Sequence, residues 1–145
     1  MDITFREMNL DDLEEIKDKL VSNFDDFWTY ETLKGELLSS SSRYIVAIDK
    51  NEIIGFAGIK IVLDEADIMN IVTKRSNRNK GIGSLLLENL ILLANKLNVK
   101  SIILEVNEEN SVAIHLYKKY GFKKIAIRKN YYKNKNAIIM KKELP

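Results

Sequence analysis

Two glycines and two basic residues stand at the start of a predicted helix, in the run Arg78-Asn79-Lys80-Gly81-Ile82-Gly83. The preceding residues 66–72 have the pattern of a strand. Such a junction suits phosphate, because free N–H groups point out of the first helical turn and the helix dipole favours an anion there. Glycine also lets the backbone approach the anion closely. The run predicts a phosphate-bearing ligand; the alternative is a glycine-rich loop that merely ends a strand.

The spacing of these glycines excludes two common phosphate-binding motifs, and the composition excludes several kinds of catalytic site. A dinucleotide fingerprint needs a third glycine where this chain has Leu86, and the Gly-Lys-Ser/Thr of a P-loop is absent. Without cysteine, the chain can form neither a thiolate metal site nor a cysteine acyl-enzyme. Because His115 is the one histidine, we expect no metal site and no Ser-His-Asp triad.

Glu105 is a carboxylate inside the apolar run Ile102-Ile103-Leu104-Glu105-Val106, which predicts a strand. A charge in such a strand is costly unless it is paired or used. Burial would raise the pKa of its carboxyl towards neutrality, which suits a general base. The alternative is a glutamate at a strand end that faces solvent, because Asn107 and Glu108 follow.

Tyr117 lies seven residues after Asn110, the predicted cap of a helix. Seven residues are about two helical turns, so both lie on one face. A tyrosine there could donate a proton to a leaving group, or it could be a half-buried packing residue.

Three aromatic side chains are candidates for the wall of a substrate groove. Tyr131 and Tyr132 stand in a polar stretch between the last two predicted strands, and Trp28 stands at the start of the second predicted helix. The alternative is that each aromatic packs only against its own segment.

Hydrophobic periodicity and capping residues predict the elements that position these side chains. Asn9 caps a first helix whose apolar stripe includes Leu10, Leu13, Ile16 and Leu20, and Thr29 caps a second. The predicted strands are residues 3–6, 43–48, 52–62, 66–72, 101–106, 122–127 and 137–140, and the later helices are residues 81–97 and 110–120. Because hairpins and helical crossovers alternate, the sheet should be mixed.

The composition is that of a soluble globular protein. The 145 residues, of which 46% are hydrophobic and 30% charged, suit a single domain over residues 1–145. No apolar run approaches the ~20 residues that span a membrane, and the N-terminus has no secretory signal. We therefore expect a cytoplasmic protein with no membrane partner.

The net charge of +2 is unevenly distributed along the chain. Residues 1–36 hold eleven acidic and four basic residues, whereas residues 118–145 hold ten basic residues and one glutamate. This asymmetry indicates either a site for an acidic partner or a solvated lysine-rich surface.

Taken in order, these pieces resemble the GNAT superfamily of acetyl-CoA-dependent N-acetyltransferases. The pyrophosphate motif of that family, Arg/Gln-x-x-Gly-x-Gly/Ala, is matched by Arg78, Gly81 and Gly83. A second family signature is matched by Asn110, Ala113, Leu116, Tyr117, Gly121 and Phe122. The resemblance implies a mixed α/β fold, with a central mixed, largely antiparallel twisted sheet of about seven strands flanked by about four helices.

Within the superfamily, the chain looks most like the RimI-type ribosomal-protein-alanine N-acetyltransferases. The similar stretches include Val62-Leu63-Asp64-Glu65-Ala66, Arg128-Lys129-Asn130-Tyr131-Tyr132 and Ala137-Ile138-Ile139-Met140. The resemblance implies direct transfer of an acetyl group to the α-amino group of an N-terminal alanine on a small-subunit ribosomal protein.

The resemblance also implies roles for individual residues. Glu105 would be the general base and Tyr117 the general acid, while Tyr131 and Tyr132 would shape the acceptor groove. Backbone groups of Ile71, Val72 and Thr73, together with Asn110, would hold the pantetheine arm. The pyrophosphate would be wrapped by Arg78, Asn79, Lys80, Gly81, Ile82, Gly83 and Ser84.

The chain departs from the family pattern at two places. Lys74-Arg75 stands where an acid and a proline are usual, and its extra positive charge could help to bind a phosphate. Asn136 replaces a common acidic residue before the last strand, which could soften selectivity for the acceptor.

Two alternatives to the protein N-terminus as acceptor stay open. The first keeps the fold but changes the acceptor to a lysine side chain, a polyamine or another small amine. The second is a non-enzymatic acyl-CoA- or RNA-binding module, which only the lysine-rich C-terminal third supports. Because no nucleic-acid motif is present, we expect no contact with nucleic acid.

Overall fold

The computed structural model describes residues 2–24 and 28–145, and the side chain of Tyr132 is outside that description. The elements follow the predicted order. The strands are β1 Thr4–Glu7, β2 Ser42–Asp49, β3 Glu52–Val62, β4 Glu65–Thr73, β5 Ser101–Asn107, β6 Lys123–Tyr132 and β7 Lys135–Glu143. The helices are α1 Leu10–Ile16, α2 Tyr30–Leu38, α3 Ile82–Lys96 and α4 Ser111–Lys119, with the shorter turns η1 Lys17–Lys19, η2 Leu20–Phe24 and η3 Arg75–Asn77. None of the helices described is long and apolar enough to cross a membrane.

The described strands form one seven-stranded sheet in the order β1-β2-β3-β4-β5-β7-β6. Neighbouring strands are antiparallel except β4 and β5, which α3 joins as a crossover, so the sheet is mixed as predicted. Two hairpins have tight turns, at Lys50-Asn51 and Lys133-Asn134. Both residues of each turn have positive φ, which matches the twist of the paired strands.

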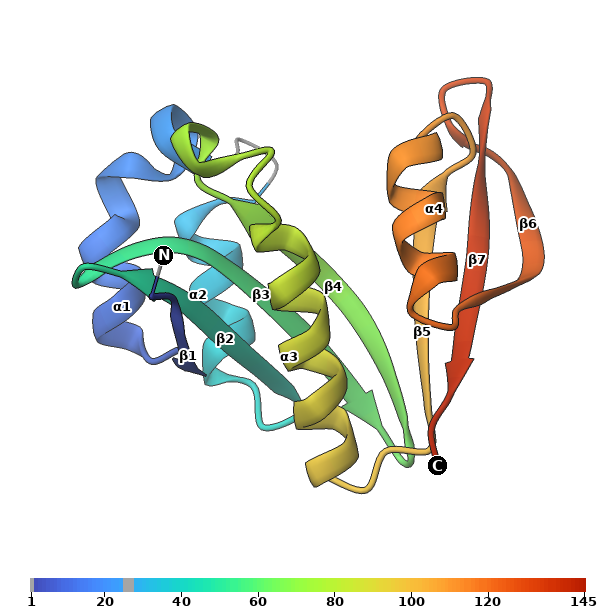
Figure 1. Ribbon diagram of the computed structural model, residues 1–145, viewed down its shortest axis with the longest axis horizontal. Coiled ribbons are helices and arrows are strands. Elements are labelled where there is room, and N and C mark those ends of the chain that lie inside the picture. Colours follow the sequence, from blue (N-terminus) through green and yellow to red (C-terminus); the bar gives the residue numbers. More distant parts are fainter. Residues whose placement is uncertain (1, 25–27) are drawn as a thin grey trace.

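The parallel pair β4 and β5 is joined over only a short stretch. Glu65–Asp67 pairs with Ser101–Ile103, although β4 continues to Thr73 and β5 to Asn107. Beyond Asp67 the two strands diverge (Figure 1). The facing edges of both strands therefore carry backbone N–H and C=O groups that no strand partner satisfies at this place.

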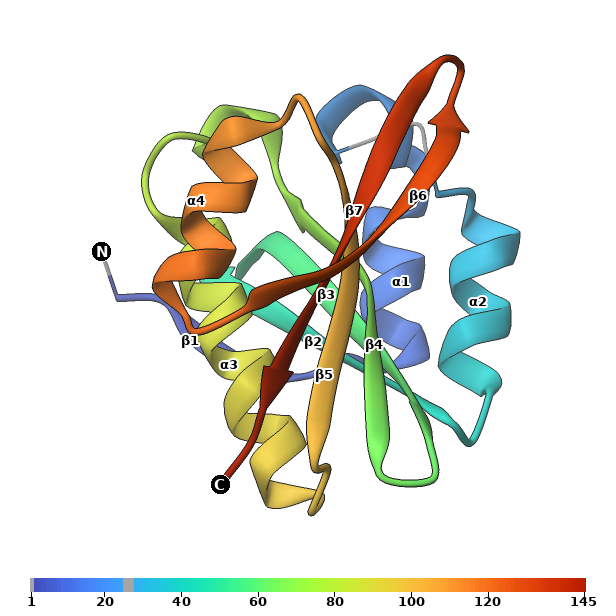
Figure 2. The same cartoon turned by 90° about the vertical axis from the view of Figure 1, so that its right-hand side faces the viewer.

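Helices cover both faces of the sheet, with α1 and α2 on one face and α3 and α4 on the other (Figure 2). Leu13, Leu33 and Phe56 belong to the core beneath α1 and α2. Leu86 of α3 and Ile102 of β5 belong to the core on the opposite face. Because side chains alternate along a strand, the two faces of β4 and β5 present different residues to these two layers.

The structure corrects two of the predictions, one on the apolar stripe of the first helix and one on the extent of the sixth strand. Leu10 does not join the apolar stripe of the first helix, because as the first residue of α1 it lies 37% exposed at the rim of the fold, while Leu13, Ile16 and Leu20 are buried. The stretch around Tyr131, expected between two strands, belongs to β6, although the pairing of β6 with β7 is irregular between Arg128 and Tyr132 and returns only at Tyr132–Lys135, beside the two-residue turn.

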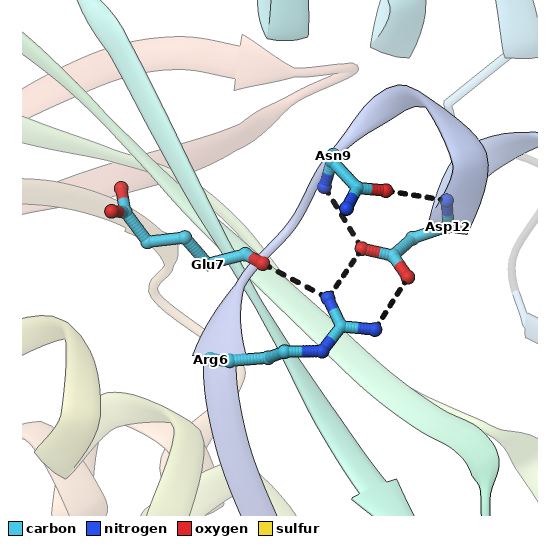
Figure 3. Close-up of polar contacts among 4 residues, drawn as sticks. All are labelled: Arg6, Glu7, Asn9 and Asp12. Carbon is cyan, nitrogen blue, oxygen red and sulfur yellow. Dashed lines mark hydrogen bonds and ion pairs between the residues drawn. The ribbon is translucent and has the colours of Figure 1, made fainter.

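A capping box with an added ion pair starts α1 (Figure 3). Asn9 Oδ1 accepts a hydrogen bond from the Asp12 N–H at 3.0 Å, and Asp12 Oδ2 accepts from the Asn9 N–H at 2.8 Å. Arg6 on β1 donates to both carboxylate oxygens of Asp12, each at 2.7 Å. The nearly buried carboxylate thereby joins the first strand to the first helix, which precedes the segment that carries Trp28.

We expect Asp12→Asn to lower the free energy of unfolding at pH 7 by about 1–3 kcal/mol, because the substitution removes a buried charge that accepts several hydrogen bonds. Burial raises the pKa of Asp12, but the Arg6 hydrogen bonds, the Asn9 N–H and the Arg6 charge together hold that pKa below its ordinary value. Stability from a depressed pKa is present above the unfolded value, near ~4, and is lost as the pH falls through the folded value.

The difference between wild type and Asp12→Asn should therefore shrink as the pH falls from about 5 towards 2. Urea denaturation at several pH values measures this difference. The matched control is Asp11→Asn, which changes an exposed carboxylate in the same helical turn. A difference that stayed constant down to pH 2 would contradict the role given to the ion pair.

Candidate active site

One pocket lies where β4 ends and α3 begins. It has a volume of about 360 Å³. Its lining residues are Ile71, Val72, Thr73, Asn77, Arg78, Asn79, Gly81, Ile82 and Gly83. The structure thus brings together most of the residues expected to bind the cofactor, and it adds Asn77, which sequence reasoning missed. Lys80, Ser84 and Asn110, which were also expected there, do not line this pocket.

The backbone at the start of α3 has the properties expected of an anion site. Gly81 has a φ of 80°, a left-handed conformation that favours glycine, and it is the N-cap without a side-chain hydrogen bond. The first N–H groups of α3 are therefore not capped by that residue. A Cβ added at Gly83 would have no atom within 4 Å, so a phosphate can approach the backbone from this side. These features suit the pyrophosphate of coenzyme A.

The arginines of this region bind backbone carbonyls. Arg78 donates from Nε to the Thr73 carbonyl at 3.2 Å and from Nη2 to the Phe24 carbonyl at 2.8 Å. Arg75 donates to the Ser22 carbonyl at 2.9 Å. These bonds tie the pocket loop to η2, on the segment before Trp28.

Lys74, the other basic residue of the unusual Lys74-Arg75 pair, forms an ion pair with Glu52. Arg75 is bonded to a backbone carbonyl, as described above. Both charges therefore have partners within the fold, and the idea that they supply extra charge for a phosphate finds no support in these contacts.

A second pocket, of about 380 Å³, lies on the α1–α2 face where β4 and β5 begin to diverge. Its lining residues are Trp28, Asp67, Ile68, Met69, Ile103, Leu104, Glu105 and Tyr131. Three residues predicted from different parts of the sequence, Trp28, Glu105 and Tyr131, thus meet in one cavity. Asp67 was missed, because a single acidic residue in a strand gives no signal of its own. The expected role of the Tyr132 side chain lies outside the described residues.

Glu105 is not buried, which agrees with the alternative of a glutamate near a strand end that faces solvent. Its side chain is 31% exposed, and Oε1 accepts a hydrogen bond from Arg128 Nη1 at 2.9 Å. Leu104 and Val106 point into the core beneath α3 and α4, so Glu105 points the other way. The pairing of β4 with β5 ends two residues before it, at Ile103. A carboxylate in contact with both the pocket and solvent can pass a proton to bulk water.

Tyr131, which lines this second pocket, lies beside Arg128 of the same strand. The Arg128 guanidinium lies 4.5 Å from the centre of the Tyr131 ring, close enough for a cation–π interaction. Because Arg128 also binds Glu105, the three side chains form a connected group across β5 and β6.

Tyr117 and Asn110 lie on the opposite face of the sheet, on α4. The Tyr117 ring packs edge-on against Phe122, with centroids 5.9 Å apart, and borders the core beneath α3 and α4. Asn110 Oδ1 accepts a hydrogen bond from the Ala113 N–H at 3.2 Å, which confirms the predicted cap. Tyr117 lines neither of the two pockets described above.

Two curated relatives cover most of the chain. A Bacillus subtilis protein, provisionally named ribosomal protein bS18-alanine N-acetyltransferase, is 34% identical over 93% of this chain and 91% of its own length. The ribosomal protein bS18-alanine N-acetyltransferase of Haemophilus influenzae is 41% identical over 78% of this chain and 80% of its own length.

Solved structures share the fold over nearly the whole chain. The ribosomal-protein-S18-alanine N-acetyltransferase of Escherichia coli superposes with a TM-score of 0.88 and 29% identity, covering 98% of this chain and 94% of that one. A GNAT family acetyltransferase from Elizabethkingia anophelis with acetyl-CoA bound has a TM-score of 0.77 and 26% identity, with 98% of each chain covered.

We expect Gly83→Leu to block coenzyme A while leaving the fold intact, because the new side chain would enter the first pocket. Its affinity for coenzyme A, measured by isothermal titration calorimetry, should fall at least about tenfold, or ~1.4 kcal/mol. Gly35→Leu is the matched control, since a Cβ at that helical glycine also meets nothing within 4 Å. Unchanged binding by Gly83→Leu would contradict the placement of the pyrophosphate at this turn.

One family covers most of the sequence. The sequence model of the acetyltransferase (GNAT) family matches residues 5–122, which include both the glycine-rich turn and Tyr117. Relatives above 30% identity over most of the chain carry acetyltransferase names. The chain therefore belongs to the GNAT family and is an acyltransferase that uses acetyl-CoA.

Proposed function

We propose that this enzyme acetylates the N-terminal α-amino group of a protein, and that its acceptor is the N-terminal alanine of a small-subunit ribosomal protein. The names of the relatives support this acceptor. The observation that carries the proposal is the second pocket, in which Glu105 lies with Trp28 and Tyr131 beside the divergence of β4 and β5. Because ribosomes are cytoplasmic, the reaction would take place in the cytoplasm.

Glu105 would act as the general base. An amine attacks only when neutral, and a free α-amine has a pKa near ~8, well below the ~10.4 of lysine. An α-ammonium therefore gives up its proton near neutral pH more readily than a lysine side chain does, and Glu105 would accept that proton directly or through one water. The solvent-exposed side of Glu105 gives that proton a route to bulk water.

The other groups would act on the thioester. Acetyl-CoA supplies an activated carbonyl carbon, to which the amine nitrogen forms a bond while the carbon–sulfur bond breaks. Backbone N–H groups on the edge of β4 beyond Asp67, near Ile71, Val72 and Thr73, have no partner on β5 and could hold the pantetheine arm and polarise the carbonyl. Tyr117 would give its proton to the departing thiolate. No covalent enzyme intermediate is needed, in keeping with a chain without cysteine.

The acceptor is tested by acetyl-CoA turnover with a panel of amines. We expect turnover with short peptides that start with a free alanine, and none with the same peptides blocked at the N-terminus, with blocked lysine peptides or with spermidine. Release of free thiol measures the rate, and mass spectrometry locates the acetyl group. If the enzyme acetylated only blocked lysine peptides or spermidine, it would still be an acetyltransferase, but the proposed acceptor would be wrong.

Replacing the proposed base should reduce turnover without affecting the cofactor. Glu105→Gln should lower kcat with an alanine-starting peptide by about 10²–10⁴-fold at pH 7, because general acid–base catalysis contributes about that much. Its affinity for acetyl-CoA should stay that of wild type. Glu109→Gln is a matched control, since Glu109 is also exposed and ion-paired, with Lys135, but lies outside the pocket. If Glu105→Gln kept full turnover at neutral pH, another group would have to be the base.

A further inference from the structure

Besides Glu105, the second pocket is lined by another carboxylate, that of Asp67 on β4. In the parallel register Asp67 is the partner of Ile103, so their side chains lie on the same face of the sheet. Glu105 follows Ile103 by two residues and therefore also points to that face. The pocket thus receives one carboxylate from each of the two strands that diverge at its base.

Asp67 is exposed at the pocket and lies opposite Lys60 of β3 in the part of the chain that the structure describes. Its carboxylate forms no ion pair there within 4.0 Å and accepts no side-chain hydrogen bond. Glu105 is held by Arg128, and the neighbouring Glu65 on β4 is bound by Ser101 and Lys141. Asp67 is therefore an acidic group of this pocket that the fold itself does not use.

The charges around Asp67 favour the arrival of a cation. Loss of hydration raises the pKa of Asp67, and the negative charges of Glu65 and Glu105 raise it further. Lys60, the partner of Asp67 on β3, forms no ion pair with it within 4.0 Å, and Arg128 and Lys141 are each bound to a glutamate. A positively charged group placed beside Asp67 would relieve this repulsion between like charges.

We propose that Asp67 is a positioning residue that holds the protonated α-amino group of the acceptor in the pocket, beside the carboxylate of Glu105. This inference rests on the proposed function and specifies how its substrate is recognised. An ammonium group has three N–H donors, so it can bind Asp67 and still direct one proton to Glu105, directly or through water. The rings of Trp28 and Tyr131, which line the same pocket, suit a cation as well. After Glu105 accepts the proton, the neutral amine is bound less strongly by Asp67 and is free to attack.

The test is steady-state kinetics of Asp67→Asn with an alanine-starting peptide. We expect its KM for the peptide to rise about tenfold, or ~1.4 kcal/mol, while kcat and the KM for acetyl-CoA change little. Asp67→Glu, which keeps the charge, should recover part of the loss. The control is Asp64→Asn, which removes a nearby charge in the turn before β4, outside the pocket, and should behave as wild type.

A second readout separates recognition of the charge from any structural effect. A peptide whose N-terminus is already acetylated has no ammonium group, so its inhibition constant should be the same for wild type and Asp67→Asn. Raising the salt concentration should lower the affinity for the peptide with a free N-terminus. The decrease should be larger for wild type than for Asp67→Asn, because salt screens the proposed interaction.

The outcomes distinguish this inference from the proposed function. If wild type acetylates alanine-starting peptides and Asp67→Asn keeps the same KM, the inference is wrong and the function stands. A loss in kcat alone, or an equal loss of affinity for the acetylated peptide, would also overturn it. If wild type acetylates no free N-terminus, the proposed function fails first.

Discussion

The short pairing between β4 and β5 is the constraint on which both pockets depend. Three residue pairs hold these parallel strands together, and beyond Asp67 and Ile103 they diverge. On β4 the divergence leads to the turn before α3, where the first pocket lies. On β5 it exposes Glu105 in the second pocket. Strands that continued to pair here would satisfy the backbone groups that the divergence leaves without a strand partner.

Hydrogen bonds join the loop of the first pocket to η2. Arg78 lines the first pocket and binds the carbonyl of Phe24, and Arg75 binds that of Ser22. Both carbonyls belong to η2, on the segment that precedes Trp28 in the second pocket. Arg78 therefore joins the turn of the first pocket to η2.

Most of the fold could be predicted from the sequence because its signals are local. The caps at Asn9, Thr29 and Asn110 and the glycine-rich turn depend on neighbouring residues, and the structure has them where they were expected. For Glu105 the sequence left both burial and exposure open, because the choice depends on contacts between distant segments. Asp67 was missed for the same reason: only the parallel register places it near Glu105. GNAT membership confirms the predicted enzyme and excludes the non-enzymatic alternative, while the acceptor and the roles of individual site residues stay predictions.

The basic C-terminal third has a simple physical consequence at the outer strand of the sheet. β6 is an edge strand, since β7 is its one neighbour in the described sheet, and Lys123, Lys124, Arg128 and Lys129 lie along it. Its register against β7 is also broken twice. Charged side chains and bulges both prevent an open edge from adding a strand of another molecule. The lysines thus protect the protein from edge-to-edge aggregation, whatever further partners they contact.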